Sequence, residues 1–298
     1  MNTQQTYNIC TTEIPQEAFD WYDEYAHGDI DRRTFLKRLG AIGLTAAAVS
    51  GGLLPNYALA EQVSFNDADI KATYATYSSV GAFDEGRGYL VTPTDVKPKT
   101  PAVLVVHENR GLNPYIKDVA RRLAKRGFIA FAPDILHSLG GYPGNDDEGR
   151  IMQKSLDRAK VEIDFINAAK FLKNHDLSSD KLGAVGFCFG GYICNMLAAR
   201  EPELVNAVVP FYGTPAKEAF IKNIKSPLLL QFAELDKRVN RSWPDYETQL
   251  KAINADYQAY VYKGVNHGFH NDSTARYSEI EAELAWSRTL EFFKHHLT

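Results

Sequence analysis

The sequence has 298 residues, of which 45% are hydrophobic and 12% aromatic, which is enough apolar material for a sizeable buried core. Its 33 Lys and Arg residues nearly balance 37 Asp and Glu residues, for a net charge of −4. This balance excludes a global basic surface for nucleic acid or an anionic membrane. Cysteines at positions 10, 188 and 194 are too few for a disulfide scaffold, and they lack the C-x-x-C spacing of a zinc site.

The first sixty residues have the order of features of an export signal. The basic sequence R-R-T-F-L-K (32–37) precedes an apolar run from Leu39 to Leu54, and Ala58-Leu59-Ala60 follows. The run has 16 residues rich in Ala and Gly, whereas a membrane-spanning helix needs about 20 strongly apolar residues. We therefore expect no stable membrane insertion.

This leader resembles a twin-arginine signal, which implies transient contact with the twin-arginine export machinery and a periplasmic or secreted protein. The A-x-A pattern predicts cleavage after Ala60, so residues 1–60 are a leader and residues 61–298 a single domain. Two alternatives stay open for the apolar run: a core helix rich in small residues, or an uncleaved amphipathic anchor.

Beyond the leader, strand patterns alternate with helix patterns. Two β-rich stretches open the domain and are expected to be antiparallel edge strands, and the later strand candidates are nearly uniformly apolar, as in a parallel sheet. The strands are predicted at 74–80, 86–93, 101–107, 128–134, 181–187, 207–213, 227–234 and 257–264. Helices are predicted from Pro114, over about 151–173, over 188–200 and over about 278–295. The alternation predicts an α/β fold with a mostly parallel sheet and helices on both faces.

One irregular segment, S-L-G-G-Y-P-G-N-D-D-E-G-R (138–150), follows the carboxyl end of a predicted strand. Open α/β sheets bind ligands at that edge, so the segment is a candidate substrate loop. A solvated connector is the alternative.

The strongest chemical signal is G-F-C-F-G (186–190), which stands between a buried strand and a helix. This is the nucleophile-elbow pattern with Cys188 in place of serine. The flanking glycines leave room for a sharp turn, and a helix N-terminus favours the thiolate. The N–H of Phe189 would point at a developing oxyanion. A structural cysteine is the alternative.

The third cysteine, Cys194, lies six residues after Cys188 on the same predicted helix. That spacing rotates the two side chains apart by about 240° and separates them by about 9 Å along the axis. We therefore expect Cys194 to pack in the core.

An elbow nucleophile needs an acid and a histidine, in that order along the chain. Asp236 and His267 each follow a predicted strand, so Asp236 can orient His267, which can take the thiol proton. Glu234 and His270 are the rivals, and we interpret them as supporting residues.

Together these motifs resemble the dienelactone hydrolase family of α/β-hydrolases over most of residues 75–298. The resemblance rests on G-F-C-F-G-G, on E-x-D at the acid, on N-H-G-F at the histidine and on V-V-H-E-N-R-G-L-N (105–113). In the family, the glutamate of this last segment lies beside the nucleophile and takes part in controlling thiol ionisation, which implies that role for Glu108. The next residue, Asn109, would supply the second oxyanion N–H. A carboxylate beside a thiol favours the neutral thiol.

Two neighbourhoods depart from the family pattern. Family members that cleave dienelactones hold the substrate carboxylate with arginines after the A-P-D strand and shortly past the histidine. Here those neighbourhoods, residues 132–138 and 267–271, contain no arginine. Fold and ester chemistry therefore carry over more safely than the dienelactone substrate. The substrate-binding candidates that remain are Arg110, His137, Tyr142, Trp243 and His270. A surface or loop-bracing role is the alternative for Arg110, and core or loop packing is the alternative for Tyr142 and Trp243.

The combined prediction is a cysteine-dependent hydrolase of a small ester or lactone, acting through a Cys-His-Asp triad and a thioester. No cofactor or metal is expected. A non-catalytic ligand-binding protein on the same fold is the alternative, and a redox thiol protein is a third, although it would need a better-placed resolving cysteine. The pattern specifies neither the natural ester nor the oligomeric state.

Overall fold

The computed structural model describes residues 14–44, 55–57 and 61–298. The chain divides into two compact units, residues 1–55 and residues 56–298. Most of the predicted apolar run and the predicted cleavage motif at Ala58–Ala60 lie outside the described residues. Among the residues that are described, no helix is both long enough and apolar enough to cross a membrane.

The first unit contains two helices, α1 (Gln16–His27) and α2 (Arg32–Ala41). Gly28 ends α1 in the left-handed conformation at φ 79°, and the Asp31 side chain caps α2 by accepting the N–H of Thr34. The pair has a small core of its own, in which Phe35 stacks on Tyr25 with ring centroids 4.9 Å apart. The twin-arginine pattern therefore lies on a folded helix.

The second unit contains one eight-stranded sheet and the remaining helices. Its strands are β1 (Ile70–Ser79), β2 (Asp84–Pro93), β3 (Thr100–Val106), β4 (Ile129–Pro133), β5 (Ser178–Phe187), β6 (Ala207–Phe211), β7 (Leu228–Ala233) and β8 (Tyr257–Tyr262). Its helices are α4 (Pro114–Ala124), η1 (His137–Leu139), α5 (Asp146–Ser155), α6 (Arg158–Lys173), α7 (Phe189–Arg200), α8 (Glu218–Ile221), α9 (Lys237–Asn240), α10 (Trp243–Ala252) and α11 (Glu279–Leu297).

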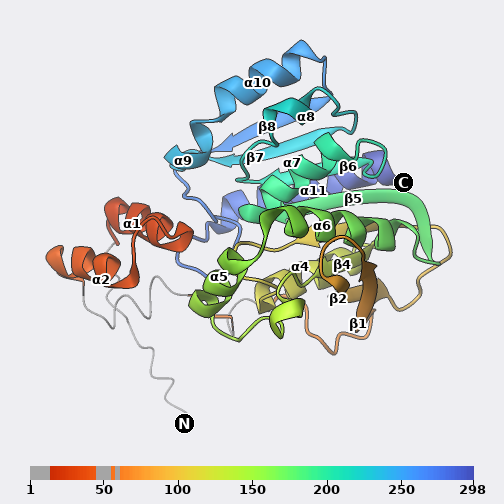
Figure 1. Cartoon of the computed structure of the whole chain (residues 1–298), viewed down its shortest axis with the longest axis horizontal. Coiled ribbons are helices and arrows are strands. Elements are labelled where there is room, and N and C mark those ends of the chain that lie inside the picture. Colours follow the sequence, from red (N-terminus) through yellow and green to blue (C-terminus); the bar gives the residue numbers. More distant parts are fainter. Residues whose placement is uncertain (1–13, 45–54, 58–60) are drawn as a thin grey trace, which may run out of the picture. The chain divides into compact units, whose positions relative to one another are not determined.

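The strand order across the sheet is β1-β2-β4-β3-β5-β6-β7-β8 (Figure 1). The pairs β1–β2 and β2–β4 are antiparallel, and every other pair is parallel. The sheet is thus mostly parallel with an antiparallel start, which confirms the predicted fold class. β1 is an edge strand, as predicted. The predicted edge position of β2 is wrong, because β2 pairs with β1 on one side and with β4 on the other.

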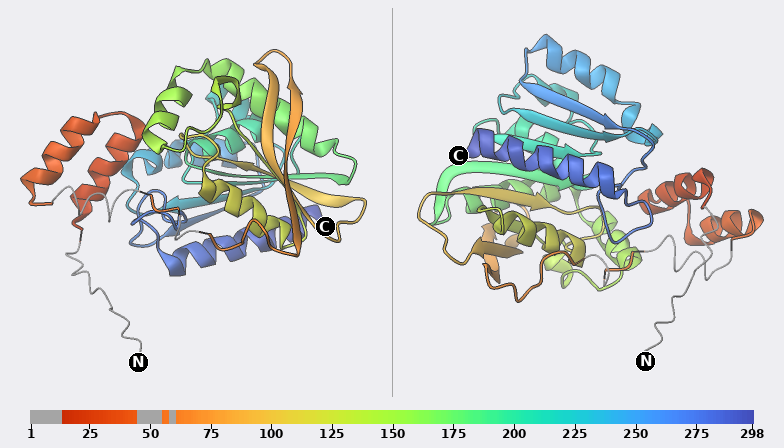
Figure 2. Two further views of the ribbon diagram at one scale, coloured as in Figure 1. Left: turned by 90° about the horizontal axis from the view of Figure 1, so that it is seen from below. Right: turned by 180° about the vertical axis from the view of Figure 1, so that it is seen from behind.

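Helices cover both faces of this sheet (Figure 2), so the central strands are buried on both sides. Along β3, Ala102, Leu104 and Val106 face the core formed with α6 and α7. Val103 and Val105 face the opposite core, formed with α4 and α11. This two-sided burial explains why the strand reads as a continuous apolar run.

Two predicted boundaries are wrong. The helix expected over about 151–173 is two helices, because Asp157 is extended and its side chain caps α6 by accepting the N–H groups of Ala159 and Lys160. The irregular segment 138–150 is only partly a loop, since Asn145 caps the first turn of α5. The three acidic residues that follow Asn145 favour that helix start.

Candidate active site

Cys188 occupies a sharp turn between β5 and α7. Its backbone has φ 57° and ψ −110°, a conformation that non-glycine residues rarely adopt. Its N–H donates to the carbonyl oxygen of Phe211 (3.1 Å), and its own carbonyl accepts the N–H of Tyr192 (3.2 Å). The elbow is thus tied to β6 on one side and to α7 on the other.

The glycines around Cys188 permit close packing of backbones. A Cβ atom at Gly190 would lie 2.2 Å from the carbonyl oxygen of Val106, and one at Gly186 would lie 2.2 Å from that of Gly190. No side chain fits at either position, so α7 can begin directly against the end of β3. That approach places Cys188 near the loop after β3, which carries Glu108 and Asn109.

His267 and Asp236 come together as the sequence predicts. Asp236 Oδ2 lies 2.5 Å from His267 Nδ1, while its Oδ1 caps α9 by accepting the N–H of Val239. Cys188 Sγ and a ring nitrogen of His267 lie within 4.8 Å of each other. The thiol, the imidazole and the carboxylate therefore form one buried cluster at the carboxyl edge of the sheet.

The rival residues lie elsewhere. Glu234 is a surface carboxylate that accepts from Lys263 Nζ at 2.6 Å. His270 is buried, with Nδ1 2.6 Å from the Tyr115 hydroxyl and its ring on that of Phe187. Burial, with a contribution from Arg122, holds the pKa of His270 well below its usual range. His270 thus packs neutral behind the elbow.

Glu108 is buried beside the thiol. Burial raises the pKa of its carboxyl; Arg110 opposes the rise, Cys188 adds to it, and Arg276 opposes it. Asn271 Nδ2 donates to Glu108 Oε2 at 3.1 Å. The Glu108 carboxyl and the Cys188 thiol each disfavour ionisation of the other, because two negative charges at short range repel each other.

Arg110 is buried and belongs to a part-buried polar cluster with α5. Its Nη1 lies 2.8 Å from Asp146 Oδ2, and the Tyr142 hydroxyl donates to Asp146 Oδ1 at 2.7 Å. The Tyr57 hydroxyl lies 2.8 Å from both oxygens of the same carboxylate. We call these four side chains the Asp146 cluster.

The other predicted residues have simpler surroundings. Asn109 lies in the loop after β3 and Phe189 at the first position of α7. His137 lies 3.5 Å from Glu85 at the start of β2. The Trp243 ring packs on Phe232 at the β7–β8 end of the sheet, with centroids 4.9 Å apart.

Sequence reasoning missed two buried residues at the site. Arg276 lies nine residues after His267, beyond the neighbourhood expected to hold an arginine, and its guanidinium packs over Gly268, where a Cβ atom would be 2.9 Å away. The Tyr212 ring lies 4.8 Å from that of His267, and its buried hydroxyl has no hydrogen-bond partner among the described residues. The position of Arg276 depends on how the loop after His267 folds back, so no spacing rule predicts it. Tyr212 directly follows β6, and the carboxyl end of that strand was the signal that could have identified it.

Cys194 is fully buried in the core of α7, as its spacing predicts, and burial raises the pKa of its thiol well above the usual value. Cys188 and Cys194 are not bonded to each other.

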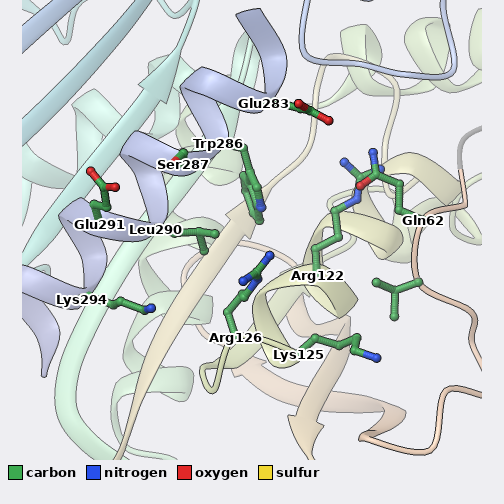
Figure 3. A pocket seen from close by; sticks show the side chains of 11 residues that line it. Gln62, Arg122, Lys125, Arg126, Glu283, Trp286, Ser287, Leu290, Glu291 and Lys294 are labelled. Carbon is green, nitrogen blue, oxygen red and sulfur yellow. The ribbon is translucent and has the colours of Figure 1, made fainter. Parts of the chain in front are cut away.

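A groove of about 700 Å³ lies apart from this cluster, between α4 and α11 (Figure 3). Trp286 and Leu290 project from α11 toward Arg122 and Arg126. Cys188 and the other members of the cluster do not line this groove.

Comparison with known proteins shows which family contains this chain. The model of the dienelactone hydrolase family matches residues 87–297. The chain belongs to the dienelactone hydrolase family. As a member, it is an ester or lactone hydrolase. A second family model, described as YqhI-like, matches residues 10–43.

Individual relatives agree with this membership. Protein usf of Aquifex pyrophilus is 37% identical over 222 residues, which are 71% of this chain and 94% of that protein. A protein of Aquifex aeolicus with a provisional carboxymethylenebutenolidase name is also 37% identical, with the same coverage. Among solved structures, a dienelactone hydrolase-type protein of Klebsiella pneumoniae has a TM-score of 0.69 at 26% identity, covering 76% of this chain and 99% of that one.

Proposed function

We propose that this hydrolase cleaves a small ester or lactone with Cys188 as the nucleophile, His267 as the base and Asp236 as the residue that orients His267. The observation that carries the proposal is the 2.5 Å contact between Asp236 and His267 Nδ1, with a ring nitrogen of His267 within 4.8 Å of the sulfur. This arrangement leaves Nε2 of His267 to exchange protons at the thiol. No cofactor takes part.

In the first half-reaction, Nε2 of His267 takes the Cys188 proton as Sγ bonds to the substrate carbonyl carbon. The carbonyl oxygen becomes an oxyanion, which the N–H groups of Phe189 and Asn109 stabilise. When the C–O bond to the leaving oxygen breaks, His267 returns the proton to that oxygen. The product is a thioester on Cys188 and a free alcohol or enol.

In the second half-reaction, His267 takes a proton from water as the water oxygen bonds to the thioester carbon. The C–S bond then breaks, the carboxylic acid leaves and the sulfur recovers its proton from His267. Asp236 stabilises the imidazolium in both halves. Glu108 opposes ionisation of the free thiol, so the thiol is ionised chiefly when substrate is bound.

The test compares Cys188→Ala with Cys194→Ala on p-nitrophenyl acetate and on enol lactones. We expect Cys188→Ala to lose at least about a thousandfold in kcat/KM, because no other group can form the thioester. Cys194→Ala, which removes a thiol from the core of the same helix, should keep the activity of its folded fraction.

Undiminished turnover in Cys188→Ala would refute the proposal. The alternative of a ligand-binding protein predicts saturable binding of the ester without an acyl-enzyme burst in the wild type.

We also propose that the chain is exported through the twin-arginine machinery and is processed after Ala60, to act in the periplasm or outside the cell. The order of basic cluster, apolar run and A-x-A motif supports this, as does the exposure of Arg32 and Arg33 at the start of α2. Arg32→Lys with Arg33→Lys should leave the protein inside the cell, while Lys37→Arg should not. N-terminal sequencing of the exported chain should begin at Glu61, and an intact Met1 would contradict processing.

A further inference from the structure

Residues Asn56 and Tyr57, which precede the predicted cleavage point, bind two parts of the hydrolase unit. The Asn56 N–H donates to the carbonyl oxygen of Ser273 at 2.6 Å. The Tyr57 hydroxyl lies 2.8 Å from both carboxylate oxygens of Asp146, and its ring packs against the core shared by α4 and α11. Both contacts lie within the second unit.

The first of these contacts leads to Glu108 through the loop after His267. Ser273 donates to Asn271 Oδ1 from its N–H (3.0 Å) and from its hydroxyl (2.6 Å). With its oxygen held in this way, Asn271 turns its Nδ2 to Glu108 Oε2 at 3.1 Å. Asn56 therefore holds the loop that supplies a donor to Glu108.

The second contact leads to Glu108 through α5. Asp146 holds Arg110, whose charge stabilises the Glu108 carboxylate. The helix is itself fixed on this loop, because a Cβ atom at Gly149 would lie 2.3 Å from the Arg110 carbonyl oxygen. Gln153 Oε1 also accepts the N–H of Gly111 at 3.1 Å.

We propose that Asn56 and Tyr57 form a clamp that positions Glu108, and that Tyr57 is a positioning residue for the reaction although it belongs to the predicted leader. The clamp joins two routes that converge on this carboxyl, one through Asn271 and one through Arg110. Cleavage after Ala60 would therefore separate Asn56 and Tyr57 covalently from the hydrolase domain whose Glu108 they position. The inference rests on the proposed role of Glu108 beside Cys188.

The experiment uses three full-length variants that each remove one phenolic hydroxyl. Tyr57→Phe and Tyr142→Phe each remove a donor to Asp146, whereas Tyr74→Phe alters an exposed ring on β1. The readouts are kcat/KM per folded molecule on an aryl ester, and the pH midpoint for alkylation of Cys188 by iodoacetamide, measured on the Cys188 peptide.

We expect Tyr57→Phe and Tyr142→Phe each to lower kcat/KM by about fivefold to tenfold, because the loop that carries Glu108, Asn109 and Arg110 then holds the proposed oxyanion donor of Asn109 less precisely. A loosened clamp holds Arg110 and Asn271 less firmly on Glu108, which is then neutral over a wider pH range. The alkylation midpoint should therefore move to lower pH by a few tenths of a unit. Tyr74→Phe should match the wild type in both measurements.

Two results would overturn the clamp. One is that Tyr57→Phe and Tyr74→Phe have the same kcat/KM and the same pH midpoint for alkylation of Cys188. The other is a loss of thermal stability in Tyr57→Phe with an unchanged midpoint, which would make Tyr57 purely structural. Failure of the proposed function is distinguishable, because in that case Cys188→Ala retains turnover whatever Tyr57 does.

Discussion

The backbone at Cys188 holds a side chain in a conformation that glycine adopts more easily. Strain of this kind costs about 1–3 kcal/mol and persists where the surrounding structure fixes it, here through Phe211 and Tyr192. The strain turns the sulfur outward from the strand end. The conformation of Cys188 thus lowers the stability of the fold at the residue proposed as the nucleophile.

Glycine at position 188 should relieve this strain. We expect Cys188→Gly to be more stable than Cys188→Ala by about 1 kcal/mol in chemical denaturation, because Ala keeps the clash that Gly lacks. The matched pair Cys194→Gly and Cys194→Ala, inside α7, should show the opposite order, since glycine weakens a helix interior. An equal or reversed order at position 188 would mean that the elbow is unstrained.

Glu108 should make both thiol ionisation and stability depend on pH. Its folded-state pKa is raised by burial, so its contribution to stability is fully present at acidic pH and is lost as the pH rises through the folded pKa. Glu108→Gln keeps an oxygen for Asn271 and removes the charge. We expect the variant to have a higher Tm than the wild type at pH 8, with a smaller difference at pH 4.

The same variant should move the pH midpoint for alkylation of Cys188 to lower pH, because no carboxylate then opposes the thiolate. Glu234→Gln, which alters the surface pair with Lys263, is the control and should leave that midpoint unchanged. A midpoint that rises in Glu108→Gln would contradict a tuning role.

At the scale of elements, the site depends on α7 starting directly against β3. Gly190→Ala places a Cβ atom 2.2 Å from the Val106 carbonyl oxygen, a backbone atom that cannot move alone. We expect a loss of at least about 2 kcal/mol in unfolding free energy and loss of activity, since the loop with Glu108 must shift. Gly40→Ala on α2 meets nothing within 4 Å and should be neutral or stabilising. Full activity in Gly190→Ala would show that the close approach is dispensable.

Over the whole molecule, buried histidines make the hydrolase unit sensitive to acid. Burial lowers the pKa of His107 and, more strongly, of His270. A histidine with a depressed folded pKa contributes stability above its unfolded pKa of about 6.5, and that stability is lost as the pH falls toward the folded value.

His270→Gln should therefore flatten the pH dependence of stability below about pH 6.5. The variant takes up one proton fewer on unfolding. This changes the slope of unfolding free energy against pH by roughly 1.4 kcal/mol per pH unit. Urea denaturation at pH 5, 6 and 7 measures this slope, and His295→Gln, at an exposed position in the last turn of α11, is the control. A slope equal to that of the wild type would place His270 in a polar, protonatable environment.

The sequence by itself determined the fold class, because periodicity reports burial directly: apolar runs such as 101–107 have to be covered on both faces. It also placed Cys188, Asp236 and His267 at one edge, since the carboxyl ends of parallel strands meet there. Asp157 was an available helix-start signal that a continuous helical pattern obscured.

Only the tertiary structure decided the surroundings of the thiol. Arg276 and Asn271 act on Glu108 from the loop after His267, and Tyr212, directly after β6, packs on His267. These contacts depend on packing between segments far apart in the chain. The contacts of Asn56 and Tyr57 span 217 and 89 residues, respectively, and local patterns carry no information at such separations. Long-range polar contacts form only where packing brings distant segments together. The sequence therefore did not predict the proposed clamp on Glu108.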